Sequence, residues 1–399
     1  MKSRSVAILL AIVFCLLFPF SSFSKDKIRI GQAISLSGPL AEGAAVCEPY
    51  WDLWVKDVNA AGGIYVKEYG KKLPIEFIKY DDKSDIGTMT KLLEKLIIDD
   101  KVDFIFPPWG TAFLYAAAPI ANKHGYILIG GAGGAEKLKE LKLPYFFQCL
   151  NFSETQMPVL AEILSELGIK KVAVFFFADL HGIEYSGRAV PEFAHKGIDV
   201  VMVKSFPPGI KDFSPLLKEA KAKAAEGLFL ACYPGEGILA AKQASELGID
   251  FDAFFVSVGP GFTFFKDVLG PEAVEGIMGG GAWNEKSGPG AKWLSDHFKQ
   301  VFRTENPNYW GGLYFYASLQ HFQKAIEKAG TLNQKKIRDT LAKERFDTVL
   351  GPYWYDERQI FVNHPGEIGQ WQGGTFEVVD PGPKRTAKPK IKPPWPKKR

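Results

Sequence analysis

Short apolar runs alternate with amphipathic stretches through most of this 399-residue chain, and the series begins twice. The first series opens with the strand-like segment 28–34, and the second starts after Leu150 and includes the continuous apolar run 172–177. A run without polar alternation is typical of a strand that is covered on both faces. Repeated strand–helix–strand units predict parallel sheets with helices on either side. The sequence therefore predicts an α/β fold built from two similar lobes.

The expected elements follow this alternation. In the first series we expect strands over 28–34, 73–80, 102–106 and 126–129. Between them we expect a helix that ends at 62–63, a second helix around 92–97 and a third helix over 112–124. In the second series we expect strands over 172–177, 200–204, 228–232 and 254–258. Between them we expect a helix that ends at 196 and two further helices over 216–225 and 238–247. The unit lengths are irregular, which excludes a solenoid.

The N-terminus has the features of a secretory signal peptide. Lys2 and Arg4 precede an apolar run over 6–20, and small residues over 22–24 allow cleavage before Lys25. The run is shorter than the roughly 20 residues that span a bilayer, which favours a cleaved signal over an uncleaved anchor. We therefore expect a periplasmic protein without its first 24 residues. Cys47, Cys149 and Cys232 then remain, and buried, unreactive thiols are the simplest interpretation.

The C-terminal segment 380–399 has an unusual composition. It contains eight basic residues, one acidic residue and six prolines, which predicts a disordered tail. Without the two N-terminal cations and the net seven positive charges of this segment, the overall charge of +4 becomes −5. A basic surface is therefore not a property of the fold, and we expect no nucleic-acid partner. Contact of the tail with anionic lipid or nucleic acid is the alternative.

Several short segments, in this order and spacing, resemble the leucine/isoleucine/valine-binding branch of type I periplasmic binding proteins. These segments are 30–39, 58–64, 80–82, 118–121, 212–216, 243–248 and 275–276. The resemblance implies two Rossmann-like lobes joined by three crossover strands near 147–151, 276–283 and 348–355. Lobe one would comprise 26–148 and 280–352, and lobe two 149–279 and 353–379. It also implies a monomeric carrier that traps a small-molecule solute between the lobes for the membrane permease of an ABC transporter.

Loops at the carboxyl ends of parallel strands should line the gap between the lobes. In lobe one these are Trp109-Gly110-Thr111, which opens a helix, and the loop 130–134, which contains Ala132, Gly133 and Gly134. Trp109 could stack on a ligand and Thr111 could donate to it, whereas packing under the loop and helix capping are the structural alternatives. The loop 130–134 does not match the dinucleotide-binding motif, and we expect no cofactor.

In lobe two the candidate ligand-binding residues are Asp179, His181, Tyr233 and Gly259. The resemblance implies that His181 and Tyr233 present rings that close over the solute. It also implies that Gly259 occupies the place of a glutamate that pairs with the ammonium group of an amino acid, and that Gly133 and Gly134 replace hydroxyl side chains.

The absence of that glutamate leaves two interpretations of the ligand. A different carboxylate could pair with the ammonium group, or the ligand is an aromatic or apolar carboxylate or an amide. The available carboxylates are Glu42, Asp179, Glu184 and Glu236.

Two other classes of function are compatible with a chain of this size and composition. An enzyme is disfavoured, because the six histidines show no metal-ligand spacing and no nucleophile motif of the hydrolases occurs. A ligand-sensing receptor or regulatory domain with the same clamshell fold remains the alternative to a transport protein.

Overall fold

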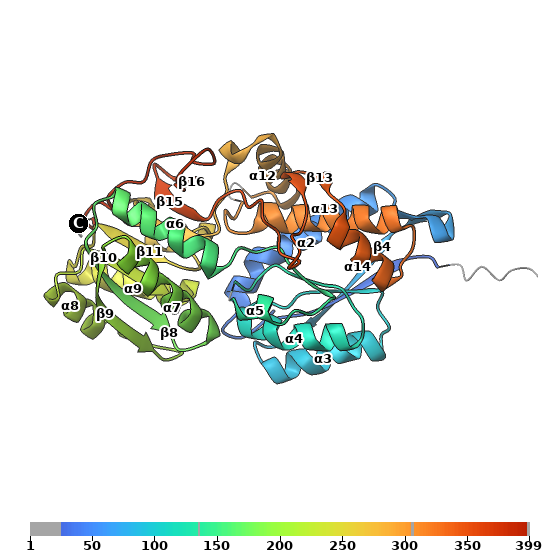
Figure 1. Ribbon diagram of the computed structural model, residues 1–399, viewed down its shortest axis with the longest axis horizontal. Helices are drawn as coiled ribbons and strands as arrows, with labels where there is room; N and C mark the ends of the chain where they lie inside the picture. Colours follow the sequence, from blue (N-terminus) through green and yellow to red (C-terminus); the bar gives the residue numbers. More distant parts are fainter. Residues whose placement is uncertain (1–24, 135, 305–306, 397–399) are drawn as a thin grey trace, which may run out of the picture.

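The computed structural model describes residues 25–134, 136–304 and 307–396. Figure 1 shows two α/β lobes side by side, with β8 to β11 in one lobe and β4, α3 and α13 in the other. This arrangement confirms the predicted fold class. The expected signal peptide lies outside the described residues. Among the described helices, none combines the length and hydropathy needed to cross a bilayer.

The sheet of lobe one is parallel. β1 (Ile28–Ile34) pairs with β4 (Ile75–Asp81) on one side and with β5 (Phe104–Phe106) on the other. β6 (Leu128–Gly130) and β7 (Phe146–Gln148) form a further parallel pair. Two short hairpins belong to this lobe, β2 (Ile64–Val66) with β3 (Lys71–Leu73) and β13 (Phe346–Thr348) with β14 (Gly351–Tyr353). Its helices are α2 (Ala41–Ala60), α3 (Ile86–Ile98), α4 (Thr111–Lys123), α5 (Lys137–Glu140), α12 (Pro289–Phe302), α13 (Gly312–Ala329) and α14 (Gln334–Lys343).

Lobe two is built on a seven-stranded sheet. The strand order is β16-β15-β12-β11-β10-β8-β9. The parallel strands are β8 (Lys171–Phe177), β9 (Asp199–Phe206), β10 (Gly227–Ala231), β11 (Ala253–Val256) and β12 (Ile277–Gly280). The helices of this lobe are α6 (Ser153–Glu166), α7 (Leu180–His195), α8 (Ser214–Ala222), α9 (Pro234–Leu247), α10 (Thr263–Leu269) and α11 (Pro271–Val274).

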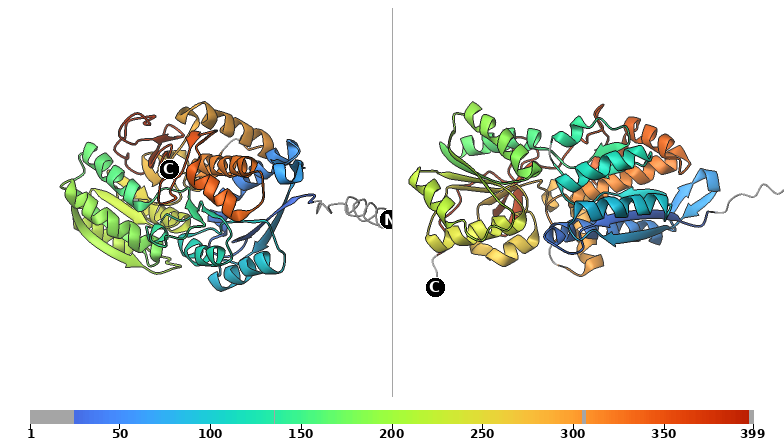
Figure 2. Two further views of the ribbon diagram at one scale, coloured as in Figure 1. Left: turned by 45° about the vertical axis from the view of Figure 1, so that its right-hand side comes forward. Right: turned by 90° about the horizontal axis from the view of Figure 1, so that it is seen from below.

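Both faces of this sheet are covered, as the apolar run 172–177 predicts. Val172 and Val174 of β8 pack in one core cluster with α6 and α7. Ala173 and Phe175 point to the opposite face and pack with α8 and α9. The view from below in Figure 2 shows helices on both faces of the sheet.

An antiparallel hairpin at one edge of this sheet was not among the expected elements. β15 (Ile368–Gln372) and β16 (Thr375–Val378) are joined by Gly373 and Gly374, which have φ angles of +56° and +83°. Positive φ at both central residues is the geometry of a two-residue hairpin turn, and glycine adopts it without strain. The hairpin extends the parallel sheet beyond β12, with which β15 pairs antiparallel.

The chain passes between the lobes later than predicted at its third crossing. β14 pairs with β13 in lobe one, and the Tyr353 ring stacks on Phe361 with 3.9 Å between ring centroids. Phe361 also donates its N–H to the Gln148 carbonyl at 2.8 Å. The segment up to Phe361 therefore packs on lobe one, and the chain joins lobe two only at β15. The predicted boundary at 352/353 is too early, because the aromatic residues after it complete the core of lobe one.

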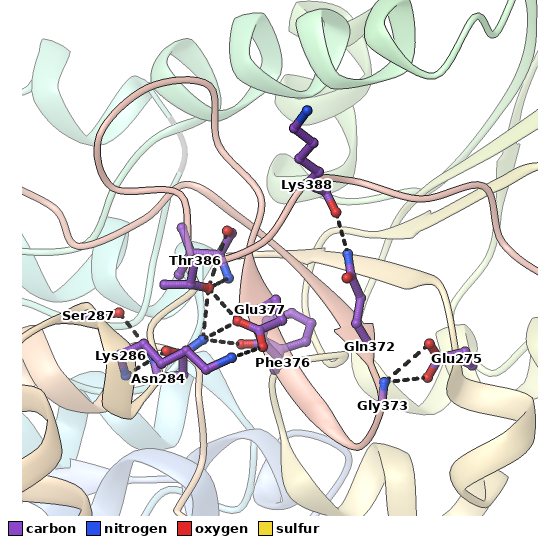
Figure 3. A network of polar contacts seen from close by, with 11 residues as sticks. Glu275, Asn284, Lys286, Ser287, Gln372, Gly373, Phe376, Glu377, Thr386 and Lys388 are labelled. Carbon is purple, nitrogen blue, oxygen red and sulfur yellow. Dashed lines mark hydrogen bonds and ion pairs between the residues drawn. The ribbon is translucent and has the colours of Figure 1, made fainter.

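The predicted disorder of 380–399 is wrong for residues 380–396, which form an ordered strap along lobe two. Gln372 donates its side-chain amide to the Lys388 carbonyl at 2.8 Å, and Thr386 accepts the N–H of Val378 at 2.9 Å (Figure 3). Thr386 also donates to Glu377, which lies beside Asn284 and pairs with Lys286. Because the strap's polar groups find partners on β15 and β16, the basic, proline-rich composition does not prevent order.

Trp395 anchors the far end of the strap. Its side chain is buried, and its ring meets Phe254 edge-on with 5.6 Å between centroids. The indole Nε1 donates to the Ile249 carbonyl at 2.8 Å, and the backbone N–H donates to Asp250 at 2.7 Å. The buried Trp395 side chain thus gives the strap an apolar contact with lobe two. The basic, proline-rich composition of segment 380–399 does not predict such a contact.

Candidate ligand-binding site

A cavity of about 370 Å³ lies where the strand-end loops of the two lobes meet. Eight of its lining residues are predicted candidates, namely Trp109, Gly110, Thr111, Ala132, Gly133, Gly134, His181 and Tyr233. The others are Leu150, Gln156, Tyr185, Ser257, Val258 and Trp310. The rings of Trp109 in lobe one and Tyr233 in lobe two are 5.7 Å apart, so the lobes are in contact across the cavity.

The first wall comes from the start of α4. Thr111 is the first helical residue after the N-cap Gly110 and is only 3% exposed. Within the ranges that the structure describes, its hydroxyl has no hydrogen-bond partner. The structural alternative of Thr111 as a helix cap is therefore not realised. The hydroxyl is free to bind a group in the cavity, next to the unpaired N–H groups of the first helical turn.

Trp109 combines the two roles considered for it. The indole packs so closely on Gly43 of α2 that a Cβ there would lie 2.2 Å from the ring. It also lies beside the Cys47 thiol and lines the cavity. Packing on α2 therefore holds the ring rigidly in place at the cavity wall.

The glycine loop after β6 forms the adjoining wall. Gly110 donates its N–H to the Ala132 carbonyl at 3.0 Å, which ties the two loops of lobe one together. A Cβ on Gly134 would lie 2.7 Å from the Tyr185 hydroxyl oxygen, and one on Gly133 would lie 3.1 Å from Thr111 Cα. The loop carries glycine because neighbouring groups fill the space of a side chain. Its backbone N–H groups are the donors that remain.

Lobe two contributes rings and hydroxyl groups. The His181 Nε2 lies 2.9 Å from the Ser257 hydroxyl, and the His181 ring stacks on Tyr233 with 5.4 Å between centroids. Burial lowers the pKa of His181 to about 4, so the ring is uncharged near neutral pH. Tyr185 donates its hydroxyl to Gln156 Oε1 at 2.9 Å. This wall is polar but without charge.

Two predicted candidates do not line the cavity. Asp179 caps α7 by accepting the Gly182 N–H at 2.8 Å, and it accepts the Tyr233 hydroxyl at 2.7 Å. Asp179 therefore positions Tyr233 through this hydrogen bond and does not line the cavity itself. Gly259 has a φ of +131°, and a Cβ there would lie 3.0 Å from Pro234 Cα. A glutamate at this position would require the backbone to move.

Comparison with known proteins decides the family. The profile described as "Periplasmic binding protein" matches residues 27–375, which is most of the chain. The chain belongs to the periplasmic binding protein family. Such a protein takes up a small-molecule solute outside the cytoplasmic membrane and works with the permease of an ABC transporter.

The proteins similar to this periplasmic binding protein include one sequence relative and two solved structures. The leucine-, isoleucine-, valine-, threonine- and alanine-binding protein of Pseudomonas aeruginosa is 23% identical, with 89% of this chain and 92% of that protein covered. The LivJ substrate-binding protein of Streptococcus pneumoniae in complex with isoleucine is 24% identical, covers 89% of this chain and 100% of its own, and has a TM-score of 0.77. A solute-binding protein of R. palustris in complex with benzoate is 17% identical, covers 90% of this chain and 96% of its own, and has a TM-score of 0.77.

The cavity of this periplasmic binding protein has no charged lining residue. None of the four carboxylates considered as partners for an ammonium group is part of the lining: Glu42, Asp179, Glu184 and Glu236. Burial raises the pKa of Glu236, which disfavours its charged form further. Within the described ranges, no group of acidic, histidine or cysteine side chains could hold a metal ion either.

The lining residues that sequence reasoning missed have two origins. Gln156 and Tyr185 lie inside α6 and α7, where nothing in a helical pattern distinguishes a residue that faces a cavity from one that faces the sheet. Ser257 directly follows β11, and the strand-end rule applied to Gly259 could have found it.

A larger cavity of about 1170 Å³ lies between α12, the loop 348–351 and the strap. Two of its cationic side chains are already paired, Lys286 with Glu377 and Arg385 with Glu166. The cavity between the lobes, with its unpaired donors, is therefore the better candidate for ligand binding.

Proposed function

We propose that this protein binds a small organic carboxylate without an ammonium group between its lobes. It acts as a monomer, without a cofactor, and delivers the ligand to the permease of a branched-chain amino acid-type ABC transporter. The observation that carries the proposal is a buried, uncharged cavity with unpaired hydrogen-bond donors on its lobe-one wall. We expect the protein to release the solute intact, with no chemical step, as a solute-binding protein does.

The donors suit a carboxylate. Thr111 at the start of α4 and the adjoining loop residues Gly133 and Gly134 all line the cavity. In the described part of the chain, these two glycine N–H groups donate to no backbone carbonyl. The N-terminal end of a helix carries a partial positive charge, which stabilises an anion without a cationic side chain.

An α-amino acid fits less well. Its ammonium group would enter a buried site without a carboxylate among the lining residues. Burying an unpaired ammonium group costs several kcal/mol, which is enough to lower affinity by orders of magnitude. The rings of Trp109, Tyr233 and Trp310 instead favour an aromatic or apolar body. Of the two ligands in the similar structures, benzoate has this chemistry.

A ligand that contacts both walls also couples binding to closure of the two lobes. Trp109 and Thr111 belong to lobe one, and His181 and Tyr233 belong to lobe two. The ligand touches all of them only when the lobes are together, so its binding energy stabilises the closed form. The closed form then docks on the permease.

Replacing Thr111 with valine tests the proposal. The variant keeps the shape of the side chain and loses one buried donor, so we expect about tenfold weaker binding of benzoate, by calorimetric titration. Thr90→Val on the exposed side of α3 is the matched control and should leave the affinity unchanged. Equal affinities of Thr111→Val and the wild type would contradict the assignment of this wall to the carboxylate.

A further inference from the structure

The lobe-two wall of the cavity holds two polar side chains whose remaining hydrogen-bonding capacity is unused. Gln156 and His181 both line the cavity and are each 3% exposed. A polar side chain that lines a cavity with a free donor or acceptor can bind a ligand group there. Two such side chains in one wall indicate a polar ligand group opposite them.

Gln156 offers a donor. Its Oε1 accepts the Tyr185 hydroxyl at 2.9 Å, which fixes the orientation of the amide. Within the described ranges, Nε2 has no hydrogen-bond partner. Tyr185 is buried and its ring lies against His181, with 4.3 Å between the ring centroids. The tyrosine therefore holds the amide so that one donor remains available to the cavity.

His181 offers an acceptor. Ser257 has one hydroxyl proton, which it donates to the Cys232 carbonyl at 3.0 Å while accepting the Cys232 N–H at the same distance. We assign the contact of 2.9 Å between Ser257 and His181 Nε2 to a proton on Nε2, because the Ser257 proton is engaged at the Cys232 carbonyl. In a neutral ring the other nitrogen, Nδ1, is an acceptor, and no described residue donates to it.

We propose that Gln156 and His181 form a neutral subsite that recognises a hydroxyl group on the ligand, with the Gln156 amide as donor and the His181 Nδ1 as acceptor. A hydroxyl group has one donor and an acceptor oxygen, which matches this pair. The inference rests on the proposed function and narrows its ligand class to hydroxylated carboxylates. Gln156 is then a specificity-determining residue, and Tyr185 is a positioning residue that acts through it.

The test compares benzoate with its three monohydroxy derivatives, titrated into the intact protein by calorimetry. We expect at least one hydroxybenzoate to bind the wild type about tenfold more tightly than benzoate does. In Gln156→Met, which keeps the length of the side chain, this ratio should fall to about one. Tyr185→Phe should lower the ratio as well. Gln323→Met, on an exposed side chain of α13, is the matched control and should keep the wild-type ratio.

Each result has a distinct meaning. The inference is wrong if benzoate and all three derivatives bind equally, or if Gln156→Met keeps the wild-type ratio. Because the ratio compares two ligands on the same variant, a loss of folded protein does not imitate the expected result. A wild type that binds neither benzoate nor any derivative would instead contradict the proposed function itself.

Discussion

Trp395→Ala is expected to lower the free energy of unfolding by about 3 kcal/mol, measured by urea denaturation. Truncating a buried tryptophan leaves a cavity and removes apolar contacts. At this position it also removes the hydrogen bond to the Ile249 carbonyl and the edge-on contact with Phe254. The strap then loses its anchor in the core of lobe two, where Lys392 lies over the same ring with its Nζ 3.4 Å from the centroid.

Trp293→Ala is the matched control, because this tryptophan on α12 is 45% exposed. We expect a much smaller loss there, since an exposed side chain buries little apolar surface. A Trp395→Ala variant as stable as the wild type would show that the C-terminal segment contributes nothing to lobe two, as the sequence-based prediction of disorder implies.

Glu367→Gln should stabilise the protein increasingly as pH rises from 5 to 8, by roughly 2 kcal/mol relative to the wild type. Burial and the nearby Asp380 raise the pKa of Glu367 to about 7. Between the ordinary pKa and this raised value, the folded state binds more protons than the unfolded state. The wild type therefore loses stability as pH rises through this window, whereas glutamine has no charge to bury.

The substitution keeps the local contacts intact, since a glutamine oxygen can still accept from Asn151 and Thr155, now 2.6 and 3.0 Å from Glu367 Oε2. Glu166→Gln provides a control of opposite sign. Arg385 lowers the pKa of Glu166, so this variant should lose stability above the ordinary carboxyl pKa. A difference between Glu367→Gln and the wild type that stays constant with pH would contradict the raised pKa.

Much of the fold could be predicted because its signals are local. The apolar run 172–177 and the alternation around it identify a doubly covered parallel sheet, and the structure contains β8 at that place. The rule that ligands gather at the carboxyl ends of parallel strands predicted eight residues, on four separate loops, that line one cavity. The Gly373-Gly374 pair is also a turn signal in the sequence, and it marks the β15–β16 hairpin that was absent from the expected elements.

Other features depend on contacts that no local pattern contains. The strap is ordered because Trp395 reaches Phe254 and because Gln370 and Gln372 bind its backbone, pairs separated by many residues in the chain. Gln156 belongs to the site only because α6 packs against α7, which brings Tyr185 to its amide. Asp179 was a reasonable candidate, but its carboxylate is already bound by Tyr233 and the start of α7.

One calorimetric comparison tests most directly whether the site selects against an ammonium group. L-Phenylalanine and 3-phenylpropanoate share a ring and a carboxylate and differ in that group alone. We predict that 3-phenylpropanoate binds at least about 100-fold more tightly, because no lining residue carries a negative charge to pair with the ammonium group. Binding of L-phenylalanine as tight as that of 3-phenylpropanoate, or tighter, would contradict the account.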